Sequence, residues 1–337
     1  MINRYSRQVI FPGIGEKGQT KLADSQVVVI GCGALGTVIA SCLVRAGIGK
    51  TRIVDRDFIE YHNLQRQILF DEEDIREQLP KAIAAERHLK RINSEVEIEG
   101  IVADVNYTNI EKFISGADLI IDGLDNFETR LLINDASLKH RIPWIYGGAI
   151  STYGMTMNII PSETACFRCL SPSAAGGMMT QTCDTAGVIN PAPLIIGAWQ
   201  SAEALKMLVG SPDVSRDLIT IDVWNGTFHR LKVTPRPACP ACQGNYEFLE
   251  GHVGLKTVAL CGQNEVQILN PEAPAILLKE LARRLEPVVA EVKYNDFMLR
   301  FRVDDHEMIV FPDSRAILRE TTDESLARGL YSKYIGM

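Results

Sequence analysis

A glycine-rich segment near the start of the chain has the composition of a phosphate-binding turn. Gly31, Gly33 and Gly36 follow the apolar run at 27–30 and open a helical pattern. Glycine permits a tight turn and a close approach of the backbone to phosphate, and the helix N-terminus presents free N–H groups. Asp55 ends the next predicted strand, about 20 residues further on, where a carboxylate can hold ribose hydroxyls. The pattern by itself favours NAD or FAD, and a glycine turn without a ligand is the alternative.

Polar and cationic residues beyond Asp55 disagree with a simple dinucleotide site. Asp57, Asn63, Arg66 and Lys81 follow it in the chain. A dinucleotide needs few extra cations, whereas a triphosphate that loses pyrophosphate needs several to offset the charge of the leaving group. The alternative is that Arg66 and Lys81 are two solvated surface charges.

A carboxylate follows another apolar run, at 118–122. Asp125 lies just beyond it, at the carboxyl end of the expected strand, where open α/β sheets bind ligands. Such a carboxylate can reach a phosphate-bound Mg²⁺, which prefers oxygen ligands. Alternatively Asp125 is the N-cap of the next helix, although Asn126 could do the capping and leave Asp125 free.

Four of the eight cysteines form two CxxC pairs, Cys166 with Cys169 and Cys239 with Cys242. The pairs are far apart in sequence but could meet in space. Four thiolates fit a tetrahedral zinc ion with no open position, which predicts a structural rather than a catalytic metal. Buried free thiols or a redox pair are the alternatives.

A further cysteine, Cys183, lies in the segment 171–192, which is rich in Gly, Ser, Thr and Pro. We expect a long loop there, and such loops are usually functional or disordered. A lone loop cysteine is either incidental or a nucleophile.

Length and composition limit the classes of protein to which the chain can belong. Its 337 residues predict two domains, and 46% hydrophobic with 23% charged residues is ordinary for a soluble globular protein. The net charge of −7 argues against wholesale binding to nucleic acid or to an anionic membrane. No apolar run approaches the roughly 18–20 residues that span a bilayer. The start lacks the apolar segment of a secretory signal, so we expect a cytoplasmic protein in which disulfides are rare.

Apolar runs and helical patterns alternate over the first half of the chain. This alternation predicts an α/β fold with a Rossmann-like, doubly wound, mostly parallel sheet. Strands are expected at 27–30, 51–55, 97–102 and 118–122, and helices at 34–46, 80–92 and 126–140.

The pattern changes after Pro143. Residues 144–160 and 218–233 look like strands that need no intervening helix, so we expect an antiparallel extension of the sheet. A helix is expected over 193–209.

The tail is expected to be a separate unit. We place the domain boundary between a first domain at 1–248 and a small C-terminal α/β module at 249–337 whose role is unknown. In the module, Asn270-Pro271 predicts a helix start, and alternating residues over 297–303 predict a half-buried strand.

Several motifs together resemble a known family. In chain order they are Arg4-Tyr5-Ser6-Arg7-Gln8, the glycine turn, Asp55, Asn63-Leu64-Gln65-Arg66-Gln67, Lys81, Gly123-Leu124-Asp125-Asn126, both CxxC pairs and Thr182-Cys183. This set resembles the ThiF/MoeB/HesA group of adenylyltransferases, which are bacterial relatives of the ubiquitin-activating enzymes. The resemblance covers about residues 1–247. The tail is similar, more weakly, to extensions found on some ThiF-like proteins.

The resemblance implies ATP-dependent adenylation of the C-terminal Gly-Gly carboxylate of a ubiquitin-like sulfur carrier. Such a carrier is ThiS-like in thiamine biosynthesis or MoaD-like in molybdopterin biosynthesis. The glycine turn, Asp55, Asp57 and Asn63 would hold ATP, and Asp125 would hold Mg²⁺. Arg66 and Lys81 would neutralise the phosphates.

Two further residue roles are implied by the same resemblance. Arg7 would reach the triphosphate of the partner subunit in a homodimer. Cys183 would bond to the carrier or to sulfur in members that go beyond adenylation. Neither a nucleic acid nor a membrane is expected as a partner.

Two other functions stay open at this point. A nicotinamide-dependent Rossmann oxidoreductase would use the same glycine turn, although the extra cations and the CxxC pairs count against it. A non-catalytic adaptor of the same family is the other alternative, and adaptors typically lose the phosphate-handling residues, whereas Arg66, Lys81 and Asp125 are all present here.

Overall fold

The structure is a computed structural model that describes residues 4–171, 186–252, 257–260, 264–269 and 275–335. The chain forms two compact units, Met1–Val253 and Gly254–Met337. No helix among the described residues is long and apolar enough to cross a membrane.

A mixed sheet is the framework of the first unit, in the strand order β3-β2-β1-β4-β5-β6-β7-β8. Its strands are β1 (Gln26–Ile30), β2 (Lys50–Asp55), β3 (Glu97–Val102), β4 (Leu119–Asp122), β5 (Trp144–Ile150), β6 (Tyr153–Ile159), β7 (Leu218–Asp222) and β8 (Thr227–Leu231). Neighbours from β3 to β5 are parallel, and neighbours from β5 to β8 are antiparallel. The predicted Rossmann-like sheet with an antiparallel extension is therefore confirmed. Residues 144–160 and 218–233 each form a two-stranded hairpin.

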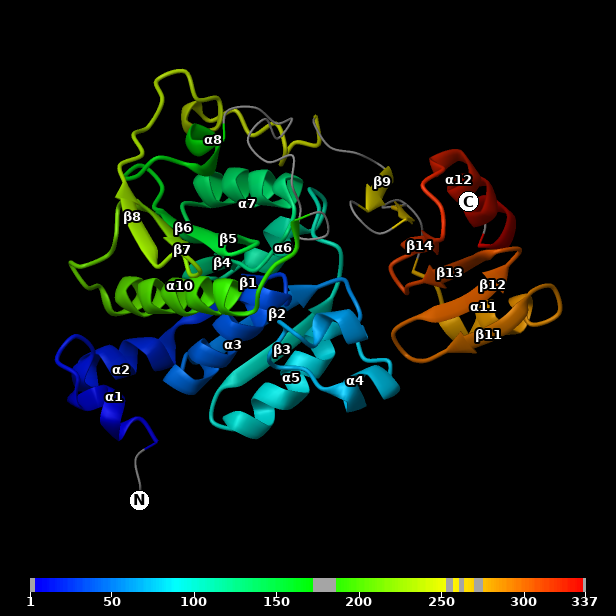
Figure 1. Ribbon diagram of the computed structural model, residues 1–337, viewed down its shortest axis with the longest axis horizontal. Coiled ribbons are helices and arrows are strands. Elements are labelled where there is room, and N and C mark those ends of the chain that lie inside the picture. Colours follow the sequence, from blue (N-terminus) through cyan, green and yellow to red (C-terminus); the bar gives the residue numbers. More distant parts are fainter. Residues whose placement is uncertain (1–3, 172–185, 253–256, 261–263, 270–274, 336–337) are drawn as a thin grey trace. The chain divides into compact units, whose positions relative to one another are not determined.

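Helices cover both faces of this sheet (Figure 1). They are α1 (Ser6–Ile10), α2 (Gly15–Asp24), α3 (Ala34–Ala46), α4 (Glu72–Arg76), α5 (Lys81–Ile92), α6 (Ile110–Ile114), α7 (Phe127–His140), α8 (Phe167–Leu170) and α10 (Pro191–Val209). Short 3-10 turns occur at Tyr61–Asn63 and Ala241–Gln243.

The central strand β1 divides the core between the two faces. Val28 and Ile30 belong to the cluster that includes α7, whereas Val27 and Val29 belong to the cluster that includes α3 and α10. All four side chains are fully buried. A strand buried on both faces explains why this run is continuously apolar rather than alternating.

Two helix starts refine the sequence prediction. Pro80 is the N-cap of α5 and lies just outside the helix, which begins at Lys81. Proline has no N–H to donate, so it is tolerated at this boundary. Asn126 is the N-cap of α7, and its side chain accepts a hydrogen bond from the backbone N–H of Thr129.

The second unit holds an antiparallel sheet in the order β11-β12-β13-β14-β10-β9. Its elements are β9 (Thr257–Leu260), β10 (Glu265–Ile268), α11 (Leu278–Leu285), β11 (Ala290–Tyr294), β12 (Leu299–Val303), β13 (His306–Val310), β14 (Ala316–Arg319) and α12 (Glu324–Tyr334). Both helices contribute side chains to one core cluster with the sheet, so the predicted small α/β module is confirmed.

The sequence predicted a helix that begins at Asn270-Pro271, and this prediction is wrong over residues 275–277, which are not helical. Residues 270–274 lie outside the described part of the chain. Helix α11 begins only at Leu278. The backbone N–H of Ile276 donates to the carbonyl of Pro312 at 2.8 Å. The backbone N–H of Ile276 therefore bonds to a residue distant in sequence, which a local sequence pattern cannot predict.

Candidate functional site

Two glycine turns meet at the point where the strand order of the sheet reverses. Gly31 follows β1 and Gly123 follows β4, and the last residues of these strands are register partners. A Cβ on Gly36 would lie 2.0 Å from the carbonyl oxygen of Gly31, and one on Gly123 would lie 2.3 Å from the same oxygen. Gly31 also has a φ of +90°, which favours glycine. The backbone is therefore packed tightly at the switch point, where doubly wound sheets bind ligands.

Asp55, at the end of β2, is held in place by two backbone donors. Its Oδ2 accepts from the N–H of Cys32 in the glycine turn, and its Oδ1 accepts from the N–H of Asp57 at 2.7 Å. The side chain is buried, with 9% of the residue exposed. The carboxylate is therefore fixed beside the turn that opens α3, as a ribose-binding acid requires.

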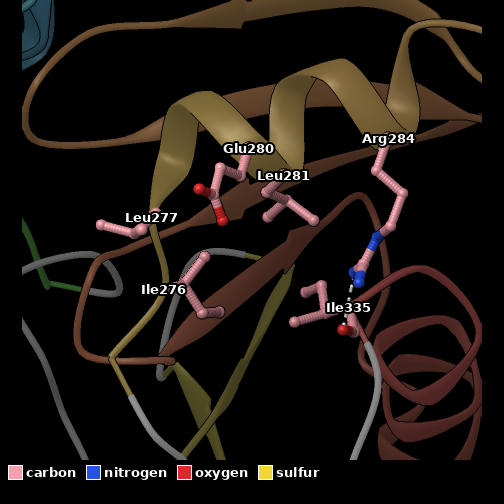
Figure 2. Close-up of a pocket in the computed structure, with 6 residues that line it drawn as sticks. All are labelled: Ile276, Leu277, Glu280, Leu281, Arg284 and Ile335. Carbon is pink, nitrogen blue, oxygen red and sulfur yellow. Dashed lines mark hydrogen bonds between the residues drawn. The ribbon is translucent and has the colours of Figure 1, made fainter.

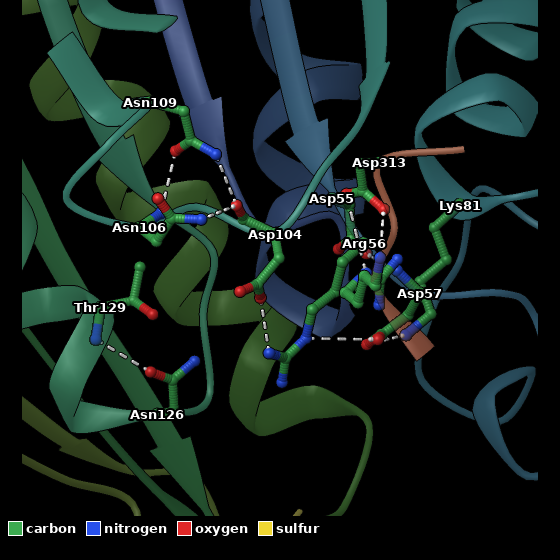
Figure 3. Close-up of polar contacts among 11 residues, drawn as sticks. Asp55, Arg56, Asp57, Lys81, Asp104, Asn106, Asn109, Asn126, Thr129 and Asp313 are labelled. Atoms are coloured by element: carbon green, nitrogen blue, oxygen red, sulfur yellow. Dashed lines mark hydrogen bonds and ion pairs between the residues drawn. The ribbon is translucent and has the colours of Figure 1, made fainter. Parts of the chain in front are cut away.

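Lys81 brings a cation to the same edge of the sheet (Figure 3). Its Nζ lies 3.2 Å from Oδ2 of Asp57, and its backbone N–H donates to the carbonyl of Asp57 at 2.8 Å. Only 7% of the residue is exposed. Burial alone would lower the pKa of Lys81, but the carboxylates of Asp57, Asp55 and Asp125 raise it above its ordinary value. The ammonium group therefore stays charged, and its ion-pair partner is Asp57.

The segment after β2 places a second group of polar residues. Asn63 is buried, and its Oδ1 accepts from the N–H of Glu60 in a capping box. Arg66 is half-buried, and its guanidinium donates to the carbonyl of His62 at 2.9 Å. In this structure the Arg66 side chain therefore bonds within the turn that carries it.

Asp125 is exposed on the loop between β4 and α7. Because Asn126 caps α7, the carboxylate of Asp125 is not needed for that purpose. An exposed carboxylate next to a glycine turn suits a hard cation such as Mg²⁺, which takes one or two carboxylates together with phosphate oxygens.

The structure adds an ion pair that sequence reasoning missed. Arg56 lies 2.6 Å from Asp104 and 3.6 Å from Asp57. The carbonyl of Asp104 accepts in turn from the side chains of Asn106 and Asn109 (Figure 3). The positions of these residues in the sequence could have predicted the pair, since Arg56 follows β2 directly and Asp104 comes two residues after the neighbouring strand β3.

Arg7 lies far from the glycine turn of its own chain. Its neighbours anchor α1 at the C-terminal end of α3, where Gln8 donates to the carbonyl of Ala46 at 2.8 Å and the ring of Tyr5 packs against Gly47. The glycine turn is at the other end of this 13-residue helix, about 20 Å away at 1.5 Å per residue. Within one chain Arg7 is therefore not brought to the other predicted site residues.

The four paired cysteines come together in one cluster. The Sγ–Sγ distances are 3.7 Å for Cys166–Cys169, 3.5 Å for Cys166–Cys239, 3.6 Å for Cys169–Cys242 and 3.4 Å for Cys166–Cys242. Tetrahedral zinc with Zn–S bonds of about 2.3 Å places its sulfurs about 3.8 Å apart. The spacing and chemistry of the thiols thus fit a zinc ion.

The thiolate form of the cluster is electrostatically unfavourable without a cation. Burial and the neighbouring thiolate of Cys169 raise the pKa of Cys166 well above its ordinary value, and burial raises the pKa of Cys242 to about 12. Four thiolates at van der Waals distance repel one another unless a metal ion compensates their charge. Cys166, Cys169 and Cys239 are buried in the main core cluster.

Cys183 lies outside the described residues. A hollow in the second unit is lined by Ile276, Leu277, Glu280, Leu281, Arg284 and Ile335 (Figure 2). The guanidinium of Arg284 donates there to the carbonyls of Tyr334 and Ile335 at the end of α12. This arginine therefore satisfies the end of a helix, and we assign the hollow no chemistry.

The geometry agrees with comparisons to known proteins. The sequence profile of the ThiF family matches residues 5–241. This chain belongs to the ThiF family. The sulfur carrier protein ThiS adenylyltransferase of Bacillus subtilis strain 168 is 42% identical over 339 residues, which cover 100% of both chains. The protein of the same name from Escherichia coli K12 is 35% identical over 243 residues, covering 72% of this chain and 95% of that one.

A solved structure shows the same fold. A crystal structure of E. coli MccB with ATP superposes with a TM-score of 0.63 at 25% identity, covering 72% of this chain and 75% of MccB. The ThiF-family membership and the enzyme class predicted from the sequence, an adenylyltransferase, are confirmed. The dehydrogenase alternative is therefore set aside.

Proposed function

We propose that this ThiF-family protein uses ATP to adenylate the C-terminal Gly-Gly carboxylate of a ubiquitin-like sulfur carrier. The observation that carries the proposal is the meeting of the glycine turn, Asp55, Lys81 and the Asp125 loop at the switch point of the sheet. A carrier of the ThiS type is favoured, because the B. subtilis ThiS adenylyltransferase matches the whole chain, including the second unit.

The nucleotide would lie with its ribose at Asp55 and its phosphates along the glycine turn. The N-terminus of α3 offers free N–H groups and the positive end of a helix dipole to those phosphates. Gly31 and Gly36 keep the turn tightly packed, and Gly33 would leave the backbone open to the phosphates. Asn63 would also line the ATP-binding site.

The reaction itself requires charge neutralisation rather than proton transfer. The carrier carboxylate is ionised near pH 7, so it attacks the α-phosphate without a general base, and pyrophosphate leaves. Lys81 and Arg66 would offset the charge that develops on the phosphates. In the structure Lys81 pairs with Asp57, so Asp57 would keep the ammonium in place until ATP provides a stronger partner.

Two metal ions complete the proposal. Asp125 would hold Mg²⁺, which when bound neutralises phosphate charge. Cys166, Cys169, Cys239 and Cys242 would hold a structural zinc ion that ties α8 to the 3-10 turn at Ala241–Gln243. We assign this zinc no part in the reaction, because four thiolates leave no open coordination position.

We also propose a homodimer in which each Arg7 serves the site of the partner subunit. The position of Arg7 supports this proposal, since about 20 Å of α3 separates its anchor from the glycine turn of its own chain. That distance exceeds the reach of one arginine side chain.

Pyrophosphate exchange into ATP tests the function directly. Purified ThiS-type and MoaD-type carriers are each offered with the intact Gly-Gly end, with an amidated end, and with the last glycine deleted. We expect exchange only with an intact carboxylate, and faster with the ThiS-type carrier. Exchange with no carrier type would favour the adaptor alternative, and equal rates with intact and amidated ends would refute carboxylate adenylation.

A further inference from the structure

One arginine joins the Asp125 loop to the neighbouring strand. Arg130, on α7, has only 4% of its surface exposed. Its Nε donates to Oδ2 of Asp122 at 2.8 Å, and one terminal nitrogen donates to the carbonyls of Leu124 and of Gly147, the latter at 2.8 Å. The guanidinium thus contacts the end of β4, the loop after it and strand β5.

Its partner, Asp122, completes a closed set of bonds around that loop. Asp122 is fully buried; its Oδ1 accepts from the N–H of Leu124 at 2.8 Å, and its Oδ2 accepts from the N–H of Gly147 at 3.3 Å. Both backbone groups of Leu124 are therefore held by this one ion pair. The ring of Tyr146 lies 5.2 Å from the guanidinium and limits its movement.

The opposite side of the loop contacts the glycine turn. A Cβ on Gly123 would lie 2.3 Å from the carbonyl oxygen of Gly31 and 2.9 Å from the Cα of Gly36. Gly123 and Leu124 are thus enclosed between the glycine turn and Arg130. Asp125 is the next residue along the chain, so its position depends on this enclosure.

Stability alone gives little reason for such a pair. Two charges taken out of water lose much hydration, and apolar replacements of buried ion pairs are often neutral or stabilising. Arg130 and Asp122 instead supply directed bonds to two backbone segments, the loop at Leu124 and strand β5 at Gly147.

We propose that Arg130 is a positioning residue that sets Asp125 against the phosphates by holding Leu124. The inference rests on the proposed adenylation and on the role of Asp125 in holding Mg²⁺. It predicts that loosening Arg130 weakens the use of the metal without displacing the nucleotide, because Asp55 and the glycine turn are held by other bonds.

The test compares Arg130→Lys with wild type in pyrophosphate exchange as Mg²⁺ is varied. Lysine keeps the charge near Asp122 but cannot bond to three acceptors in a fixed fork. We expect the Mg²⁺ concentration at half-maximal rate to rise roughly 10- to 100-fold, as for other residues that orient a metal ligand, with the KM for ATP changed less than about twofold. An unchanged Mg²⁺ dependence in a folded Arg130→Lys protein would overturn the inference.

A double-mutant cycle with Asp125→Asn identifies the route of the effect. Asp125→Asn keeps one side-chain oxygen, so a residual exchange rate at high Mg²⁺ can be compared. If Arg130 acts through Asp125, Arg130→Lys should change that residual rate less than about twofold. If the two substitutions instead reduce the rate by the product of their separate effects, Arg130 acts independently of Asp125, through general stability. Arg52→Lys is the matched control. Arg52, on β2, also bonds to a carboxylate, that of Glu99 on β3, and to a backbone carbonyl, that of Phe113 on α6. Its replacement should leave the Mg²⁺ dependence unchanged.

A second variant keeps the test decisive if Arg130→Lys does not fold. The pair Arg130→Met with Asp122→Leu removes both charges together and avoids an unpaired buried ion. We expect a folded protein with the same loss of Mg²⁺ response. Wild-type Mg²⁺ response in this double variant would refute the positioning role. Absence of exchange in wild type itself would refute the proposed function instead, so the two failures are distinguishable.

Discussion

Asn126 caps helix α7 through Thr129: its Oδ1 accepts the backbone N–H of Thr129 at 3.0 Å (Figure 3). The adjacent carboxylate of Asp125 is exposed and does not fulfil this structural role. Replacement of Asp125 should therefore affect activity, whereas replacement of Asn126 should affect stability.

Asp125→Ala should abolish pyrophosphate exchange and leave the free energy of unfolding nearly unchanged, because an exposed carboxylate outside the cap contributes little to folding. Asn126→Ala should instead lower the free energy of unfolding by about 1 kcal/mol through loss of the cap. Denaturant unfolding and exchange assays on both variants check this division. A large loss of stability in Asp125→Ala would show that Asp125 is structural.

Arg66→Ala should reduce kcat/KM for exchange by about 2–4 kcal/mol of transition-state stabilisation, as for loss of one preorganised donor. Exchange kinetics at saturating Mg²⁺ provide the measurement. Arg76→Ala is the control, because Arg76 is an exposed arginine whose partners on α4 are Glu72 and Glu73. Equal rates in wild type and Arg66→Ala would identify Arg66 as a surface charge.

One zinc ion per chain is expected in freshly purified protein. Cys239→Ser should release the metal and lower the free energy of unfolding by roughly 4 kcal/mol or more, since loss of a structural metal is among the largest single-site effects. Metal analysis and thermal unfolding check both outcomes. Cys42→Ser, on α3 and outside the cluster, should keep the zinc; native protein with no zinc and four freely alkylated thiols would contradict the assignment.

Arg7 should act across a dimer interface. An Arg7→Ala protein and an Asp125→Ala protein, each inactive alone, should regain activity when subunits are exchanged, because a mixed dimer contains one site with both residues. Mixing under conditions that permit exchange, followed by the pyrophosphate assay, provides the test. Sedimentation of the wild-type protein as a monomer at assay concentrations would exclude this arrangement.

Asp135 should make stability depend on pH. Its side chain is fully buried and accepts the N–H of Phe248 at 3.0 Å, and burial raises its pKa from 3.8 to about 6. Between these values the folded state holds a proton that the unfolded state has lost, so stability falls as pH rises from about 4 to 6 and then levels off.

The free-energy difference between wild type and Asp135→Asn should therefore decrease by up to about 3 kcal/mol over that pH range. Denaturant unfolding of both proteins at pH 4, 5, 6 and 7 measures it, and the comparison cancels groups that titrate alike in both. A difference that is constant over this range would show that Asp135 has an ordinary pKa.

Local patterns in the sequence were sufficient for the elements that surround the nucleotide site. Helix α3 was predicted at its observed bounds, and β1, β2 and β3 were placed within a residue, because each signal lies inside a short window. The GxGxxG turn and the CxxC spacing are likewise local, since they reflect what glycine backbones and thiolates can do wherever the chain folds.

Contacts between residues that are far apart in the sequence could not be predicted from short sequence windows. Arg56 with Asp104 and Arg130 with Gly147 are joined only after the parallel strands align. Asp57 meets Lys81 only after the chain after β2 returns to pair Phe58 with Pro80. The late start of α11 has the same origin, because the competing bond to Pro312 comes from another turn of the fold.

The sequence by itself therefore determined the family, the enzyme class and the candidate residues, because those depend on residue type and short spacing. The tertiary structure decided how these residues are held. It assigned the cap of α7 to Asn126, and it anchored α1 at the far end of α3, which separates Arg7 from its own glycine turn. Both outcomes depend on which of several competing hydrogen-bond partners comes within reach, and only the packed chain determines that.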